Sequence, residues 1–323
     1  MKIALTYDLK ERYLQEGYTP EEVAELDSIH TIEAIENVLR TLGHESERIG
    51  SIFDLTAALV EGRRWPLVFN IAEGLHGLCR EAQIPALLEA YRIPYVFSDS
   101  FTLAITLHKA IAKMIVHQHG VPTSPYAFIQ SIDDLNSVTL TYPLFAKPIS
   151  GGTGMGINEH SIINKEGELQ NAVANLLVRY HDGVLLEEYL PGREFTVGIV
   201  GTHKNARVIG VMEIVSSKGV YSYESKQNYL NEVRYLPVDP EVSKECSYVA
   251  LNAYRALQCR DGGRVDVKMD QRNAVNFIEV NPLAGLHPID SDLPILAKMA
   301  GIEYHTLIKQ IVDSALERVS NEQ

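Results

Sequence analysis

Two short stretches of sequence decide the fold, Gly263-Arg264-Val265-Asp266 and Phe277-Ile278-Glu279-Val280-Asn281-Pro282. Each predicts a strand, and the turn from Asp270 to Asn273 joins the two strands into a hairpin. Side chains alternate along a strand, so Arg264 shares a face with Asp266. Glu279 and Asn281 share a face of the second strand in the same way. Paired strands can therefore present all four polar side chains to a single point.

Two carboxylates and an amide oxygen are the kind of hard ligands that suit Mg²⁺, which also takes phosphate oxygens and waters. A solvated polar face would explain the alternation in this hairpin, but it would not explain why the acids gather at one end. We therefore predict that Asp266, Glu279 and Asn281 bind metal.

A second signal is a strand with a lysine that runs into a glycine-rich loop, Phe145-Ala146-Lys147-Pro148 followed by Ile149-Ser150-Gly151-Gly152-Thr153-Gly154-Met155-Gly156. Glycines allow successive N–H groups to point at an anion, and the lysine adds a positive charge. A phosphate cradle and a hairpin tip both fit this pattern. It is not a Walker loop, because no Gly-Lys-Ser/Thr follows.

Alternating strands and helices open the chain and predict a parallel sheet. The expected elements are a strand at 3–7, a helix at 21–42, a strand at 67–70, a helix from about 81 and a strand at 95–97. Ligands bind beyond the carboxyl ends of such strands, which directs attention to Asn70 to Gly77. A boundary near Phe97 precedes a helix at 102–119 and strands near 127 and 144. The rest is strand-rich, with strands at 185–189, 194–201, 207–214, 264–269 and 275–280 and a helix at 242–257.

The bulk properties of the 323 residues bound the protein class. Hydrophobic residues make up 46% and charged residues 22%, which is ordinary globular usage. A formal charge of −13 without a basic run makes nucleic acid an unexpected partner. The three cysteines form no C-x-x-C pair, and neither a secretory signal nor an apolar run of about 18 residues is present. We expect a cytoplasmic protein with reduced thiols that does not enter a membrane.

A third motif lies between the first two signals in the chain. It is similar to the segment that ATP-grasp ligases use between their last two domains, and it reads Leu186-Glu187-Glu188-Tyr189-Leu190-Pro191-Gly192-Arg193-Glu194-Phe195-Thr196-Val197. With Asn70 to Gly77, Pro94-Tyr95, Leu107-His108-Lys109 and Tyr221 to Lys226, the chain resembles the D-alanine:D-alanine ligase family over nearly its whole length. The resemblance implies an α/β fold with three domains. These are a Rossmann-like parallel sheet at 1–97, a central lid domain at 98–185, and an α+β antiparallel-sheet domain at 186–323.

The resemblance also implies a role for each matched residue. Contacts to ATP would come from Lys109, Lys147, Lys226, Gly151, Gly152 and Gly154 at the phosphates, from the backbone of Glu187, Glu188, Tyr189 and Leu190 at adenine, and from Glu194 at ribose. Asp266, Glu279 and Asn281 would hold two Mg²⁺ ions, or Mn²⁺ in their place. Catalysis would involve Arg264, which stabilises the oxyanion, with Lys226, Ser291 and His76. Substrate contacts would come from Glu73, His76, Arg80, Arg264, Gly285, Ser291 and Asp292.

The implied reaction is phosphorylation of a carboxylate by ATP, followed by attack of an amine on the acyl-phosphate. Because water would hydrolyse that intermediate, we expect the segments 150–156 and 283–293 to act as lids. The partners would be small-molecule carboxylate and amine substrates, and the resemblance suggests a homodimer.

The chain departs from the family where the substrates would bind. The family's Ser-Ala-Glu turn after the first strand is missing from the stretch 8–18. Glu25 or Asp27 could supply a replacement acid. We expect, however, that both lie on a helix and face solvent. His76-Gly77 continues as Leu-Cys-Arg-Glu, where Arg80 either binds a carboxylate or pairs with Glu81 or Glu73. Segment 281–293 has one extra residue, and Gln227 replaces a common tyrosine. These changes indicate an altered choice of substrate.

Other functions remain as alternatives. One is a ligase for a different amino acid or carboxylate in a specialised pathway, and another is an ATP-binding module without catalysis. A third is a carboxylate kinase that releases the acyl-phosphate. A Rossmann dehydrogenase is excluded because no Gly-x-Gly-x-x-Gly follows the first strand.

Overall fold

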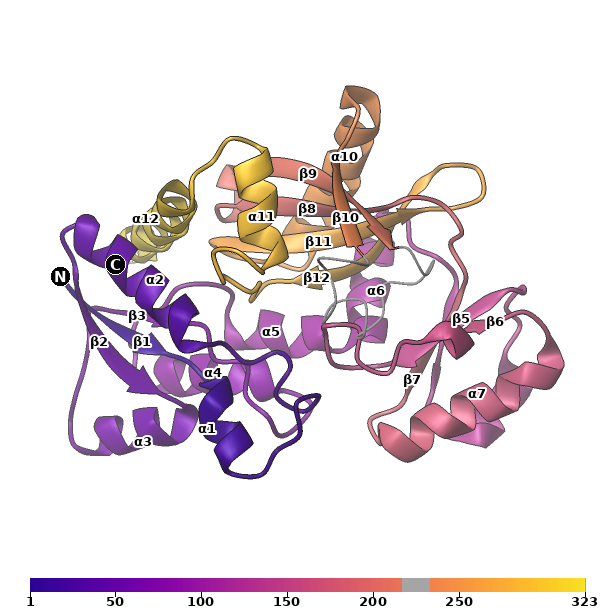
Figure 1. The fold of residues 1–323 in the computed structure, drawn as a ribbon, viewed down its shortest axis with the longest axis horizontal. Helices are drawn as coiled ribbons and strands as arrows, with labels where there is room; N and C mark the ends of the chain where they lie inside the picture. The colour runs from indigo at the N-terminus through magenta and orange to yellow at the C-terminus, as the bar shows by residue number, and fades with distance from the viewer. Residues whose placement is uncertain (217–232, 323) are drawn as a thin grey trace.

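A computed structural model describes residues 1–216 and 233–322, and it contains three sheets (Figure 1). The N-terminal sheet is parallel, with the order β2-β1-β3: β1 (Lys2–Thr6), β2 (Glu45–Gly50) and β3 (Leu67–Asn70). Helices α3 (Ile52–Val60) and α4 (Gln83–Ala90) follow β2 and β3. The alternation of strands and helices predicted this parallel sheet correctly, although β2 and α3 were not among the predicted elements.

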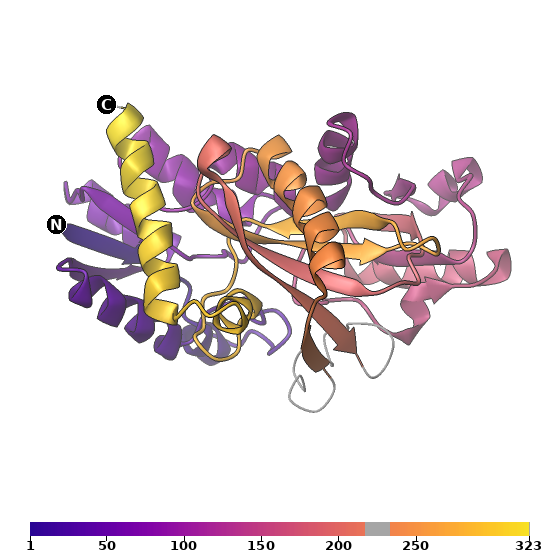
Figure 2. The ribbon, with the colours of Figure 1, turned by 90° about the horizontal axis from the view of Figure 1, so that it is seen from above.

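The other two sheets are antiparallel. The central sheet has the order β4-β7-β5-β6, with helix α7 (Glu166–Arg179) packed against it: β4 (Tyr126–Ile129), β5 (Leu144–Pro148), β6 (Ile162–Ile163) and β7 (Val184–Glu188). The C-terminal sheet has the order β10-β9-β8-β11-β12: β8 (Glu194–Val200), β9 (Arg207–Ser216), β10 (Val233–Pro237), β11 (Gly262–Met269) and β12 (Val275–Asn281). Figure 2 shows α10 (Pro240–Ala256) lying across this last sheet. The strands predicted in this half of the chain are confirmed.

The C-terminal helix α12 (Tyr304–Glu322) returns to the N-terminal sheet (Figures 1 and 2). Its buried residues Leu307, Ile308 and Ile311 belong to the same apolar core as Ile3 and Leu5 of β1. The first and last segments of the chain are therefore packed together. The predicted domain limits stay a prediction. Strand β7 pairs with both β4 and β5 and therefore belongs to the central sheet.

The predicted helix at 21–42 is wrong in its first part. Helix α2 spans Ile29–Thr41 only, and Ser28 precedes it in an extended conformation. The preceding residues fold into turns, because Val23 and Leu26 pack into a small core with Tyr13 of the short helix α1 (Lys10–Gln15). A bridge between Leu9 and Asp27 fixes the end of this turn segment. As a result, Glu25 and Asp27 are not on a helix.

The predicted helix at 102–119 is two helices, α5 (Ser100–Leu107) and α6 (Lys109–Gln118). His108 breaks them with an extended backbone, and its ring accepts a hydrogen bond from the Ile111 N–H. The break puts Lys109 in the first turn of α6. The predicted strand at 95–97 is reduced to one bridge between Val68 and Tyr95. None of the helices in the described ranges combines the length and apolar character that crossing a bilayer requires.

Candidate active site

Two cavities meet beside β12. The larger has a volume of about 460 Å³, within the usual range of small-molecule pockets, and lies between the N-terminal domain and the C-terminal sheet. The smaller, of about 100 Å³, lies between the central and C-terminal sheets. Glu279 lines both cavities, so a ligand in one can reach a ligand in the other at this carboxylate.

The hairpin of β11 and β12 brings its polar side chains together as predicted. Arg264 is paired with Asn281 across the strands, and Asp266 with Glu279. The Arg264 guanidinium Nη1 lies 2.9 Å from both oxygens of Asp266. The Thr196 hydroxyl donates to Asp266 at 2.6 Å, and the register shifts directly after Asp266. Such an irregularity is common beside active sites, where it directs a side chain.

The predicted metal ligands are hard oxygen donors from neighbouring strands. The described residues contain no group of three or more His, Cys, Asp or Glu side chains arranged to hold a metal ion. Two carboxylates and an amide are therefore an incomplete set, which is the set that Mg²⁺ uses when nucleotide phosphates supply its other ligands. The residues present fit a metal ion that binds together with a nucleotide.

Lys109 connects the glycine-rich loop to this hairpin. Its Nζ donates to the Gly151 carbonyl at 2.5 Å and lies 3.6 Å from Glu279. Burial is the main cause that lowers the pKa of Lys109. Gly151 and Gly152 line the larger cavity, whereas Gly154 lines the smaller one. Gly151 has a φ of +94°, a conformation that other residues rarely adopt. The loop therefore runs across the junction of the two cavities.

The smaller cavity has an aromatic and apolar lining that suits a nucleobase. Phe145 and Tyr189 stack there with ring centroids 6.1 Å apart, among the apolar side chains of Ile157, Leu190, Ile214 and Ile278. The N–H groups of Glu188 and Tyr189 donate to Pro125 and Pro143 carbonyls. The Leu190 N–H has no backbone acceptor within the described ranges. It can therefore donate a hydrogen bond to a ligand.

A buried ion triad supports this pocket. The Glu187 carboxylate forms ion pairs with Lys113 at 2.6 Å and with Lys147 at 2.7 Å. Burial opposes ionisation of Glu187, but the two ammonium groups outweigh it and lower its pKa to about 2. Lys113 was not predicted. It follows Lys109 by one helical turn, a spacing that places both on one face of α6. Glu194, predicted at ribose, lines the pocket and pairs with Lys268 at 2.9 Å.

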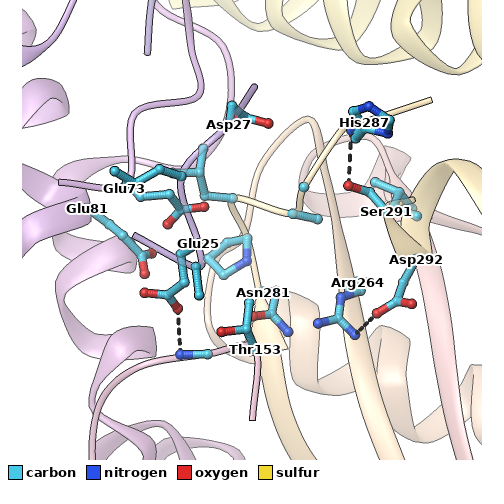
Figure 3. A pocket seen from close by; sticks show the side chains of 18 of the residues that line it. Glu25, Asp27, Glu73, Glu81, Thr153, Arg264, Asn281, His287, Ser291 and Asp292 are labelled. Atoms are coloured by element: carbon cyan, nitrogen blue, oxygen red, sulfur yellow. Dashed lines mark hydrogen bonds and ion pairs between the residues drawn. The ribbon is translucent and has the colours of Figure 1, made fainter. Parts of the chain in front are cut away.

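The N-terminal wall of the larger cavity is acidic (Figure 3). It carries the carboxylates of Glu25, Asp27, Glu73 and Glu81. Burial, reinforced by the Glu81 and Glu25 charges, raises the pKa of Glu73 well above its usual range. Burial also raises the pKa of Glu81 to about 7, against the effect of Arg80, and that of Asp27 to about 7. The expectation that Glu25 and Asp27 face solvent from a helix is wrong, because the turns at 19–28 direct them into the cavity.

Glu25 links this wall to the glycine-rich loop. Its Oε2 accepts a hydrogen bond from Arg80 at 2.7 Å, and its Oε1 accepts one from the Gly152 N–H at 2.5 Å. A side chain on residue 152 would lie 2.6 Å from that oxygen, so glycine is required for the contact. Arg80 pairs with Glu25 and approaches Glu81 only to 4.0 Å. It lies behind the wall and does not line the cavity.

The opposite wall comes from the C-terminal domain (Figure 3). Asp292, the first residue of α11 (Asp292–Met299), lies 3.2 Å from Arg264 and accepts a hydrogen bond from Tyr235 at 2.8 Å. Ser291 accepts from the His287 N–H at 3.0 Å, and Gly285 packs so closely against Ser291 that a side chain would clash with it. This wall holds a guanidinium paired with a carboxylate, together with a hydroxyl and backbone groups.

Besides Arg80, two predicted residues are not at the site that the structure describes. His76 is exposed, contacts Tyr18 at 3.1 Å and lines neither cavity. Lys226 lies outside the described residues, as do Gln227 and the rest of the segment 217–232.

Comparison with known proteins agrees with this geometry. The family model for the D-ala D-ala ligase C-terminus matches residues 115–313. The D-alanine–D-alanine ligase of Aquifex aeolicus is 31% identical over 287 residues, which are 88% of this chain and 94% of that protein. An uncharacterised protein of Sinorhizobium fredii is 29% identical over 264 residues, covering 78% of this chain and 75% of the relative.

Solved structures share the fold. A D-alanine–D-alanine ligase from Bacillus anthracis, complexed with ATP, superposes with a TM-score of 0.76 at 21% identity and covers 100% of both chains. The VanG D-Ala:D-Ser ligase from Enterococcus faecalis gives a TM-score of 0.76 at 21% identity, covering 97% of this chain and 99% of that one. The sequence match, its extent and the arrangement of the two cavities lead to one conclusion: this chain belongs to the D-alanine–D-alanine ligase family.

Proposed function

We propose that the protein is an ATP-dependent, ADP-forming ligase that joins the carboxylate of one amino acid to the amine of another. The observation that carries this proposal is the shared position of Glu279 between the two cavities, with Lys109 3.6 Å away. A nucleotide in the smaller cavity would direct its phosphates to this junction. An amino acid in the larger cavity would present its carboxylate at the same place.

The first step is attack of the substrate carboxylate on the γ-phosphorus of ATP, with ADP as the leaving group. Lys109, Lys147 and the glycine-rich loop orient the phosphates, and Asp266, Glu279 and Asn281 would hold two Mg²⁺ ions. When bound, these ions neutralise the charge that moves with the phosphoryl group. Lys226 is proposed as a further phosphate contact from the matched motif.

The second step is attack of the second substrate's amine, after it has lost a proton, on the acyl-phosphate carbon, and inorganic phosphate leaves. Arg264 lies in the larger cavity, where it would stabilise the negative charge that develops on the carbonyl oxygen. Ser291 and Asp292, on the same wall, are proposed to position the second substrate. The segments 150–156 and 283–293 would exclude water from the intermediate.

We further propose that the substrates include an amino acid other than D-alanine. The support is the replacement of the family's first-strand turn and the acidic wall that stands beside it. The fold accommodates such changes, since the superposable VanG enzyme is described as a D-Ala:D-Ser ligase. The proposed partners are these two small molecules, and a homodimer through the N-terminal domain stays a proposal by resemblance.

Phosphate release from ATP and Mg²⁺ tests the ligase across single and paired amino acids, with product masses recorded. Release that requires two amino acids, together with a dipeptide mass, is expected. D-alanine as the sole productive substrate would contradict altered specificity and leave the ligase intact. Phosphate release with one carboxylate and hydroxylamine, but never with an amine substrate, would instead identify a carboxylate kinase. ATP binding without any turnover would identify a binding module.

A further inference from the structure

The N-terminal wall of the larger cavity carries more carboxyl groups than it has cations to pair with them. Of its four carboxylates, Glu25 is paired with Arg80 and with the Gly152 N–H. Glu81 has Arg80 at 4.0 Å, and Glu73 forms no ion pair or hydrogen bond with another of the described residues. Lys10 also lines the wall, but in the described ranges it forms no ion pair with these acids. Uncompensated buried carboxylates are costly.

Polar groups around these acids also lack partners. The Thr31 side chain lines the same wall and is completely buried, and its Oγ1 makes no hydrogen bond of normal geometry in the described part of the chain. Burial raises the pKa of Asp27, and a looser hydrogen-bonding contact with the Thr31 hydroxyl partly opposes this effect. Glu81 is 9% exposed and faces the cavity. A buried hydroxyl and a buried carboxylate therefore both face a cavity large enough for a ligand.

The arrangement of these acids suits an organic cation better than a metal ion. Among the described residues, no three acids of the kind that bind metals lie close enough together to hold one. A wall that spreads its carboxylates over a wider surface suits ammonium or guanidinium groups, which donate hydrogen bonds in several directions. One α-ammonium group would balance one of these acids and leave the others without a counterion.

We propose that the substrate activated at its carboxylate is a basic amino acid, whose α-ammonium and side-chain cation together bind Glu73, Glu81 and Asp27. This inference rests on the proposed ligase function. The cation of the substrate would pair with carboxyl groups that lack a counterion on this wall. The Glu25 contact with Gly152 closes the loop beside that site, so the substrate carboxylate lies next to Lys109 and the phosphates.

The first experiment compares matched substrates in the phosphate-release assay. Ornithine and lysine, each as both enantiomers, are compared with norvaline and norleucine, which have the same chain without the terminal amine. We expect kcat/KM to be at least about 100-fold higher for the basic member of the preferred pair, because the neutral one leaves buried acids unpaired. Equal or higher kcat/KM for norvaline, norleucine or alanine would overturn the inference while supporting the ligase.

Variants locate the preference. Glu73→Gln and Glu81→Gln keep the side-chain size and remove the charge, and each is expected to reduce the ratio of basic to neutral kcat/KM by at least about tenfold, with an unchanged KM for ATP. Glu61→Gln, at an exposed position in the same domain, is the matched control. An unchanged ratio in both cavity variants would overturn the inference.

Calorimetry on the wild-type protein gives a readout that does not depend on the variants or on turnover. Binding of ornithine or lysine at pH 7, with a non-hydrolysable ATP analogue and Mg²⁺ present, is measured in two buffers of different ionisation enthalpy. A cation lowers the raised pKa values of Glu73 and Glu81, so binding should release protons, and norvaline should release fewer. Proton release by ornithine without any phosphate release would overturn the ligase and leave the cation site. Binding without proton release, or no binding, would overturn the cation site.

Discussion

In the pocket proposed to bind the nucleotide, the Glu187 carboxylate lies between Lys113 and Lys147 at 2.6 and 2.7 Å, and its pKa is held at about 2. On the N-terminal wall of the larger cavity, Glu81 is buried and Glu73 is half-buried, and their pKa values are raised. Both regions remove carboxylates from water. The first region pairs its carboxylate with two lysines of the chain, whereas the second leaves Glu73 without such a partner among the described residues. In the proposed function, ATP would therefore bind a pocket whose charges are already paired, and the amino acid would supply a counterion itself.

The largest effect is expected from Arg264→Met. If Arg264 stabilises the oxyanion, kcat falls about 100- to 1,000-fold. ATP affinity changes little, because Arg264 lines the substrate cavity and not the nucleotide pocket. Stopped assays of ADP formation and equilibrium binding of ATP measure the two quantities. Arg272→Met, on the exposed turn of the same hairpin, is the control. A kcat within a factor of three of wild type would remove Arg264 from the chemistry.

The second largest effect is expected on the free energy of unfolding, which should respond differently to changes in the two acidic regions. Lys113 is completely buried, and Lys113→Met leaves Glu187 with one counterion, so we expect the free energy of unfolding to fall by about 3 kcal/mol. Glu73→Gln should have no such cost, since it removes a charge that lacks a partner. Denaturant unfolding at pH 7.5 compares both with Lys165→Met, whose side chain is 75% exposed. A larger loss for Glu73→Gln than for Lys113→Met would reverse the comparison of the two regions.

The smallest expected effect is on the pH dependence of stability. Burial raises the pKa of Glu81 from 4.5 to about 7, so its stabilising contribution is present below the unfolded value and is lost as pH rises through about 7. Glu187, with a lowered pKa, behaves in the opposite way and loses its contribution as pH falls towards about 2. Thermal midpoints measured from about pH 5 to 8 should therefore decline less in Glu81→Gln than in wild type. Parallel curves would show that Glu81 does not titrate in this range.

The sequence alone was enough to place the groups whose position follows from a regular element. Alternation along two strands predicted that Arg264, Asp266, Glu279 and Asn281 would converge, and the register of β11 and β12 confirms it. The parallel sheet followed from the alternation of strands and helices, whereas the three-domain arrangement was implied by the family resemblance.

Groups positioned by irregular backbone or by distant partners could not be predicted. Glu25 and Asp27 appeared to be helical because the spacing of apolar residues is compatible with a helix, whereas Val23 and Leu26 instead pack against Tyr13. The role of Lys113 is explained by its ion pair with Glu187, which is 74 residues away in sequence. His76 belongs to a matched motif, but the chain after it has changed, and its ring is exposed beside Tyr18.

The contact between Glu25 and the Gly152 N–H has a thermodynamic consequence. One carboxylate takes part both in the wall proposed to hold the amino acid and in a contact with the loop proposed to cover the phosphates. Each ligand therefore favours the same closed arrangement. Reciprocity then requires that ATP increase the affinity for the amino acid by the same factor by which the amino acid increases the affinity for ATP. The enzyme would spend little ATP when its amino acid is absent.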